Sequence, residues 1–188
     1  MNIIYNNTVK IIILTIMILP FQIFFCQMIK SELNLNGNDF NEIKIENVGK
    51  VFLSKGNVNS IIMERNSDID KYIDFKIVDG IAFIKKKHSE EESEKNYFNI
   101  YITFKSENIS INALNIGSLK TKDKVCFRTI KLKIINCGKI DLLVKSKALF
   151  FDLQNVFKFR VGGHTDNLTL QKKNVMISNL QKLNITTD

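Results

Sequence analysis

The stretch LKIINCGKIDL at residues 132–142 alternates apolar and polar residues on both sides of Gly138. A period of two is typical of β-strands that bury one face, and glycine allows a tight turn where a side chain would clash. The stretch therefore predicts two short strands joined by a glycine turn. Similar stretches surround Gly117 at residues 114–119 and Gly162 at residues 157–170.

These stretches form an imperfect repeat. Gly117 and Gly138 are 21 residues apart, and Gly138 and Gly162 are 24 residues apart. A further strand pair without glycine is predicted at residues 175–177 and 183–185. Repeats of this length built from short strands are typical of a β-solenoid, in which each coil buries its apolar face against the next coil. An antiparallel sandwich, in which the same runs are hairpins, is the alternative.

The first half of the sequence also alternates with a period of two. Strands are predicted at residues 40–45, 48–53, 60–65 and 97–104. Residues 73–77 and 81–85 flank Asp79 and Gly80, which is a strong signal for an antiparallel hairpin. The charged residues 85–95 lack hydrophobic periodicity and predict an exposed loop. No segment carries apolar residues at helical spacing, so the predicted fold class is all-β.

The N-terminus has the layout of a secretory signal. Residues 1–10 are polar with one charge at Lys10, residues 11–19 are apolar, and Pro20 interrupts the run. The apolar run is too short for a helix that spans a bilayer, which needs about 20 residues. We therefore expect a signal peptide at residues 1–26, a short segment at 27–37 and a single domain at 38–188. Cleavage between Cys26 and Gln27 is favoured over acylation of Cys26 or an uncleaved anchor.

Export predicts a location in the periplasm, on the outer-membrane surface or outside the cell. Without Lys10, the mature chain has 26 basic and 19 acidic residues, a net charge of +7. Such a charge favours anionic partners such as acidic glycans or lipid headgroups, although solvated strand faces also accumulate lysines. The candidate face for an anionic ligand is Lys131, Lys133 and Lys145. Export argues against nucleic acid as a partner, and the oligomeric state is left open.

Two cysteines remain in the mature chain, Cys126 and Cys137. An exported protein can join them in a disulfide. Packing of the two thiols as small hydrophobic groups is the favoured interpretation, because Cys126 lies in an apolar stretch.

The residues do not predict an active site. His164 lies near Asp166 but lacks a nucleophile, and His88 lies among glutamates in the predicted loop, where a metal would lack fixed ligands. Asp141, Asp152 and Asp166 are too scattered to indicate a glycosidase pair. No phosphate-binding loop, Cys-x-x-Cys motif or cofactor fingerprint occurs. We therefore predict no catalytic, metal or cofactor site, and a protein that is not an enzyme.

The pattern of strands and turns resembles the head GIN domain family, the putative auto-transporter adhesins found in exported proteins of the Bacteroidetes. The resemblance covers about residues 38–188. It is carried by residues 39–45, 48–56, 69–73 and 78–84 and by the repeats at 138–142 and 163–168. It implies a right-handed parallel β-helix-like domain. Ser118 and Thr165 stand near positions where the family usually has glycine, so the coil geometry is expected to differ there.

Three functional hypotheses follow. The first is a non-catalytic cell-envelope domain that binds an acidic glycan, another surface component or a protein through the solenoid face. The second is a structural module that self-associates through the ends of its solenoid, where strand edges are open. The third is a polysaccharide-active enzyme, which the absence of paired carboxylates disfavours.

Overall fold

The structure is a computed structural model that describes residues 29–65, 73–86 and 98–186. The predicted signal peptide, Cys26, His88 and most of the predicted 85–95 loop lie outside the described residues. Every regular element of the described chain is a β-strand, which confirms the all-β prediction. No helix among the described residues is long and apolar enough to cross a membrane.

The strands belong to one mixed sheet with the order β1-β3-β6-β2-β7-β9-β8, to which β4 and β5 are added through a pairing of β5 with β2. The strand bounds are β1 (Ile29–Glu32), β2 (Glu42–Lys55), β3 (Ser60–Arg65), β4 (Ile73–Val78), β5 (Ile81–Lys86), β6 (Phe98–Phe104), β7 (Asn108–Thr121), β8 (Val125–Cys126) and β9 (Thr129–Ile185).

Antiparallel pairing is confined to the N-terminal part of the described chain. There β4 pairs with β5, β1 with β3, and β3 with β6. The β4–β5 hairpin turns at Asp79 and Gly80, whose φ angles of +52° and +72° are those of a two-residue type I′ turn. The predicted hairpin is therefore confirmed. By contrast, β2 pairs in parallel with β5, β6 and β7, and β7 pairs in parallel with β9.

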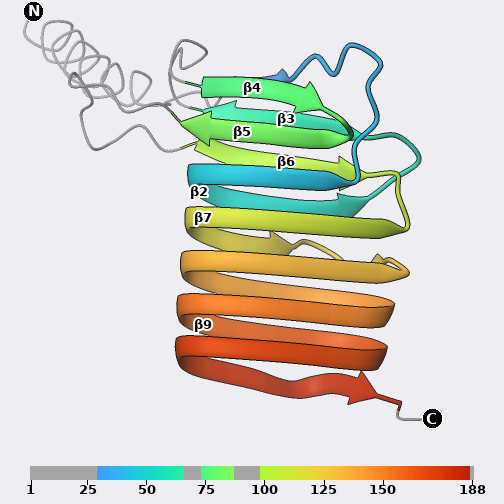
Figure 1. Cartoon of the computed structure of the whole chain (residues 1–188), viewed down its shortest axis with the longest axis vertical. Coiled ribbons are helices and arrows are strands. Elements are labelled where there is room, and N and C mark those ends of the chain that lie inside the picture. Colours follow the sequence, from blue (N-terminus) through green and yellow to red (C-terminus); the bar gives the residue numbers. More distant parts are fainter. Residues whose placement is uncertain (1–28, 66–72, 87–97, 187–188) are drawn as a thin grey trace, which may run out of the picture.

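The long strands bend, and Figure 1 shows the ribbon of β7 and β9 winding in stacked turns. We call residues 108–185 the winding segment and one circuit of its path a turn. The register of β2 with β7 runs to Glu46 opposite Leu114 and resumes at Val48 opposite Ile116, on the far side of a corner. At each bend the strand passes from one layer to the other.

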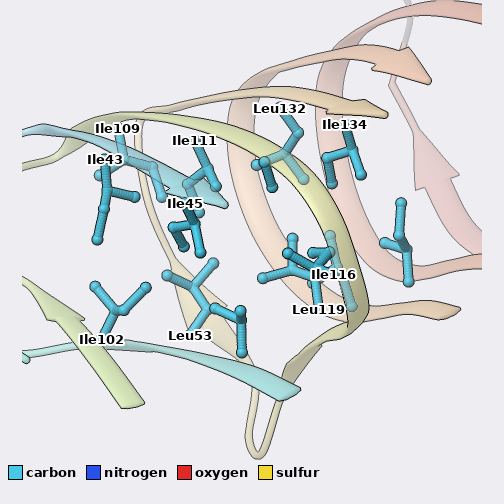
Figure 2. Close-up of a cluster of buried hydrophobic side chains, with 14 of the residues drawn as sticks. Ile43, Ile45, Leu53, Ile102, Ile109, Ile111, Ile116, Leu119, Leu132 and Ile134 are labelled. Carbon is cyan, nitrogen blue, oxygen red and sulfur yellow. The ribbon is translucent and has the colours of Figure 1, made fainter. Parts of the chain in front are cut away.

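The core lies between these two layers. Figure 2 shows Ile43, Ile45, Ile111 and Ile134 on one side, with Leu53, Ile102 and Leu119 on the other. Side chains at equivalent positions of successive turns stack along the molecule, and all are buried. One such ladder is Val48, Ile116, Cys137 and Val156, and another is Val51, Leu119, Ile140 and Phe159. This burial supplies most of the favourable free energy of folding.

The corner between the layers is built by an asparagine ladder: Asn47, Asn115, Asn136, Asn155 and Asn174. Their φ angles lie between +53° and +59°, a left-handed conformation that asparagine tolerates better than most residues. Each side-chain Nδ2 donates to the Oδ1 of the preceding ladder residue over 2.8–3.0 Å. From Asn115 onward the ladder residues are 21, 19 and 19 residues apart.

The ladder corrects the predicted repeat. Gly117 and Gly138 follow the corner asparagines by two residues and are not themselves the turning residues. They permit close approach between turns, because a Cβ on Gly117 would lie 2.6 Å from the Gly49 oxygen, and one on Gly138 would lie 2.7 Å from the Gly117 oxygen. The equivalent of Gly138 in the next turn is Phe157. The predicted alignment of Gly138 with Gly162 is therefore wrong.

Both cysteines are free, so the alternative of a disulfide is wrong. Cys137 is buried in the aliphatic ladder, as the packing interpretation predicted, and burial raises the pKa of its thiol to about 11. Cys126 is exposed. The expectation that it packs as a small hydrophobic group is wrong, because β8 places its side chain on the outer side of the strand.

Candidate anion-binding groove

A groove of about 550 Å³ crosses several turns of the winding segment on its outer surface. Its polar lining comes from Lys120, Asp141, Arg160, Asn179, Gln181 and Lys182, and its apolar lining includes Leu142, Leu143 and Val161. The groove lies outside the layer that contains the second half of β7.

The turn length brings these distant residues together. Lys120 of β7 lies in register with Asp141 of β9, and Arg160 reaches Asp141 from the next turn, 19 residues later. A further step of the same length leads to Asn179, which also lines the groove. One row of outward side chains therefore runs across four turns.

Asp141 is the one carboxylate that the described residues contribute to the lining, and two cations contact it. The Lys139 Nζ lies 2.8 Å from Asp141 Oδ2, and the Arg160 Nη2 donates to the same oxygen. Burial favours a raised pKa, but the hydrogen bonds and positive charges of Lys139 and Arg160 outweigh it and lower the pKa of Asp141. Asp141 is therefore a carboxylate at neutral pH.

The groove retains an excess of positive charge. Lys120 and Lys182 have neither an ion-pair nor a hydrogen-bond partner among the described residues. The Arg160 Nε is buried and has no hydrogen-bond partner in the described part of the chain. Together with Lys139, these groups give four cations against the single charge of Asp141, a net charge of +3. The arrangement can bind an anion that carries several acceptor oxygens.

The lysines predicted from the sequence lie elsewhere. Lys131 and Lys133 are in register with Ser110 and Asn112 of β7, in the layer opposite the groove. Both are exposed, and the Lys131 Nζ lies 5.8 Å from the centroid of the Phe150 ring. Lys145 is exposed as well but lies opposite Cys126 of β8. The structure thus brings Lys131 and Lys133 together and places Lys145 on another segment of the turn.

The other sequence candidates are held in local contacts. The His164 Nε2 lies 3.3 Å from Asp166 Oδ1. Thr165, between them, is buried, where its Oγ1 accepts a hydrogen bond from Ser146 and donates one to the Asn167 oxygen. Within the described ranges, no group of three or more His, Cys, Asp or Glu side chains could hold a metal ion.

A second cluster, which consists of Phe52, Tyr101, Glu64 and Asn99, continues the row of the groove toward the N-terminal strands. Phe52, in register with Lys120, stacks on Tyr101 with ring centroids 4.7 Å apart. The Tyr101 hydroxyl donates to Glu64 Oε2 over 2.7 Å. Burial and the bond to Glu64 raise the pKa of Tyr101 to about 12, while hydrogen bonds from Asn99 and Tyr101 lower the pKa of Glu64. The side chains of Asn99, Tyr101 and Glu64 thus form hydrogen bonds with one another.

Sequence reasoning missed Lys120, Arg160 and Lys182 as a set. The spacing of the ladder asparagines is the signal that brings Lys120 and Arg160 together. The residues five positions after Asn115, Asn136, Asn155 and Asn174 are Lys120, Asp141, Arg160 and Asn179. Alignment on asparagine, rather than on glycine, therefore places these residues in one row.

A family model described as "Putative auto-transporter adhesin, head GIN domain" matches residues 39–186. Among solved structures, a "putative adhesin" from Bacteroides fragilis NCTC 9343 is 12% identical, with a TM-score of 0.47, covering 85% of this chain and 96% of that chain. A "putative cell adhesion protein" from Clostridium sporogenes ATCC 15579 is 10% identical, with a TM-score of 0.49 and coverages of 81% and 98%. A search of curated proteins found no match.

Proposed function

Because this chain belongs to the family of head GIN domains, described as putative auto-transporter adhesins, we propose that it is a non-catalytic cell-envelope domain that binds an acidic glycan. In this proposal residues 1–26 direct export, and the domain acts in the periplasm or at the cell surface. The groove is the binding site.

The observation that carries the proposal is the net charge of +3 that remains in the groove after Asp141 is set against Lys120, Lys139, Arg160 and Lys182. The planar guanidinium of arginine suits two-point binding of a carboxylate, such as that of a uronic acid. The amides of Asn179 and Gln181 supply both donors and acceptors, which suit sugar hydroxyls. Strands are spaced by about 4.8 Å, so the row from Lys120 to Asn179 extends over roughly 14 Å. That length suits a short segment of a polymer.

The surface of Lys131, Lys133 and Lys145 is the second location for the same function. It has three lysines against the four cations of the groove, and Lys145 does not share the segment on which Lys131 and Lys133 lie. Two triple variants separate the locations, because each removes three positive charges.

We expect the variant with Lys120→Gln, Arg160→Gln and Lys182→Gln to bind polygalacturonate about 30-fold more weakly than the parent protein. Each exposed ion pair contributes up to about 1 kcal/mol, so loss of three contacts has an effect of this size. Titration calorimetry with polygalacturonate fragments at two salt concentrations measures it. Binding should weaken with salt, since exposed charges are screened.

The charge-matched control carries Lys131→Gln, Lys133→Gln and Lys145→Gln and should retain affinity within about threefold. Loss of affinity in this control alone would move the site to the other surface. If neither parent nor variants bind polygalacturonate, the acidic-glycan proposal is wrong.

Assembly through the ends of the winding segment is the alternative function. It is favoured by apolar side chains in the final described turn, where Ile177 and Ile185 are each 44% exposed. A sedimentation coefficient that does not change with protein concentration would exclude it.

We also propose that the winding segment is a right-handed parallel β-helix-like solenoid. The parallel register of β2, β7 and β9 and the asparagine ladder support this architecture. In a solenoid each turn contacts only its neighbours, so whole turns are separable units.

Deletion of residues 137–155, one 19-residue turn, should therefore leave a folded protein in which Asn174 follows Asn136 in the ladder. Deletion of residues 137–146, half a turn, should abolish folding because it shifts the remaining register. Circular dichroism and thermal unfolding compare the two variants. Equal loss of folding in both would contradict the solenoid.

A further inference from the structure

Along the winding segment, the residue next to the corner changes from glycine to an exposed apolar residue. The position two residues after each ladder asparagine is glycine in three cases, at Gly49, Gly117 and Gly138. In the next two turns it is Phe157 and Met176, which are 54% and 75% exposed. Ile177 beside Met176 is 44% exposed. We call Phe157, Met176 and Ile177 the apolar corner.

Neighbouring apolar side chains on the surface indicate an interaction site when they form a contiguous patch with a polar rim. Phe157 and Met176 occupy equivalent positions of adjacent turns, because Asn174 donates to Asn155 across 3.0 Å. Adjacent turns are about 4.8 Å apart. The two side chains therefore form a continuous ridge along the edge of the molecule.

The rim of the ridge is positively charged. From two residues before to three residues after Asn136, Asn155 and Asn174, the sequence contains Lys139, Lys158, Lys172 and Lys173 and no Asp or Glu. Lys139 is paired with Asp141, and the Lys172 Nζ donates to the Ser178 hydroxyl over 3.3 Å. Lys158 and Lys173 have no ion-pair or hydrogen-bond partner in the described part of the chain.

We propose that the apolar corner docks on an anionic lipid bilayer, with Phe157 and Met176 inserted between headgroups and Lys158, Lys172 and Lys173 against the phosphates. The ridge is convex, which suits insertion into a deformable lipid interface. Its lysines complement anionic lipids, which attract basic residues near the surface. The groove lies on a flat layer and the ridge at a corner, so this site does not depend on the proposed glycan site.

The test uses the absence of tryptophan from the chain. With Phe157→Trp, or separately Met176→Trp, mixing with phosphatidylcholine–phosphatidylglycerol vesicles should shift tryptophan emission to shorter wavelength. Vesicles of phosphatidylcholine alone should have little effect, and added salt should reverse the shift. The control is Val58→Trp, which replaces a side chain that is 68% exposed, in the connection between β2 and β3. It should show no shift.

Sedimentation with the same vesicles gives the affinity of the protein without a probe. Phe157→Gly, which restores the glycine of the earlier corners, and Met176→Gln should each weaken partitioning by about tenfold, because each removes one inserted apolar side chain. Met176 is too exposed for its replacement to disturb the fold.

Three results would overturn the proposal. They are no partitioning of the parent protein, equal partitioning of parent and corner variants, and a tryptophan shift of the same size at positions 58 and 176. A dimer that Met176→Gln dissociates would instead identify the corner as a contact between two copies and would equally overturn it.

Discussion

Replacement of Gly163 by alanine is expected to lower the free energy of unfolding by about 3–5 kcal/mol. A Cβ at this position would lie 1.9 Å from the Val144 oxygen, and the φ of +110° disfavours any L side chain. The neighbouring turn would have to move away. For a domain of this size the midpoint of thermal unfolding should fall by roughly 10 °C or more, as circular dichroism would show.

The matched control is Gly80→Ala in the β4–β5 hairpin. Gly80 also has a positive φ, +72°, but a Cβ added there would meet no atom of a non-adjacent residue within 4 Å. Its replacement therefore introduces backbone strain without a clash and should cost about 1–2 kcal/mol. Equal destabilisation at the two positions would mean that the contact with Val144 does not affect the free energy of unfolding.

Asn136→Ala should destabilise the protein by about 2–4 kcal/mol. The Asn136 side chain donates to Asn115 and accepts from Asn155, over 2.8 and 2.9 Å. Each hydrogen bond contributes about 0.5–1.5 kcal/mol, and alanine is strained at a φ of +58° by about 1 kcal/mol. Urea unfolding measures the sum.

Two variants separate the contributions. Asn136→Gly removes the hydrogen bonds without the strain and should cost about 1–3 kcal/mol. Asn36→Ala imposes the strain outside the ladder, at a φ of +50°, and should cost about 1 kcal/mol. If Asn136→Ala costs no more than Asn36→Ala, the ladder does not stabilise the fold.

Features that depend on neighbours in sequence were predicted correctly. Alternation predicted strands at residues 60–65 and 97–104, and the structure has them at 60–65 and 98–104. Asp79 and Gly80 correctly predicted a hairpin. These predictions were correct because a few adjacent residues determine both the burial pattern of a strand and the geometry of a two-residue turn.

Features that depend on the register between turns were not predicted. Glycine was taken as the corner residue, but the left-handed corner is occupied by asparagine, and glycine only relieves crowding next to it. The error displaced the third repeat by several residues. The row of Lys120, Asp141 and Arg160 depends on turn lengths of 21 and 19 residues, so the groove could not be recognised before the ladder.

The environment of two buried polar residues also depends on the register between turns. Ser118 and Thr165 were expected to alter the coil because they replace glycine, and both are buried. Thr165 is accommodated by its hydrogen bond with Ser146, 19 residues earlier. A hydrogen-bond partner 19 residues away cannot be predicted from the sequence without the correct turn length. Lys131, Lys133 and Lys145 remain a predicted ligand surface.

The asparagine ladder also affects how the protein ages chemically. Deamidation begins when the backbone nitrogen of the following residue attacks the asparagine side chain, and a bulky following residue hinders that attack. Val48, Ile116, Val156 and Val175 follow four of the ladder asparagines, and all four are β-branched. Asn36, outside the ladder, is followed by Gly37 and lacks this protection. Four of the five ladder asparagines are thus hindered from deamidation, whereas Asn136 is followed by Cys137, which is not β-branched.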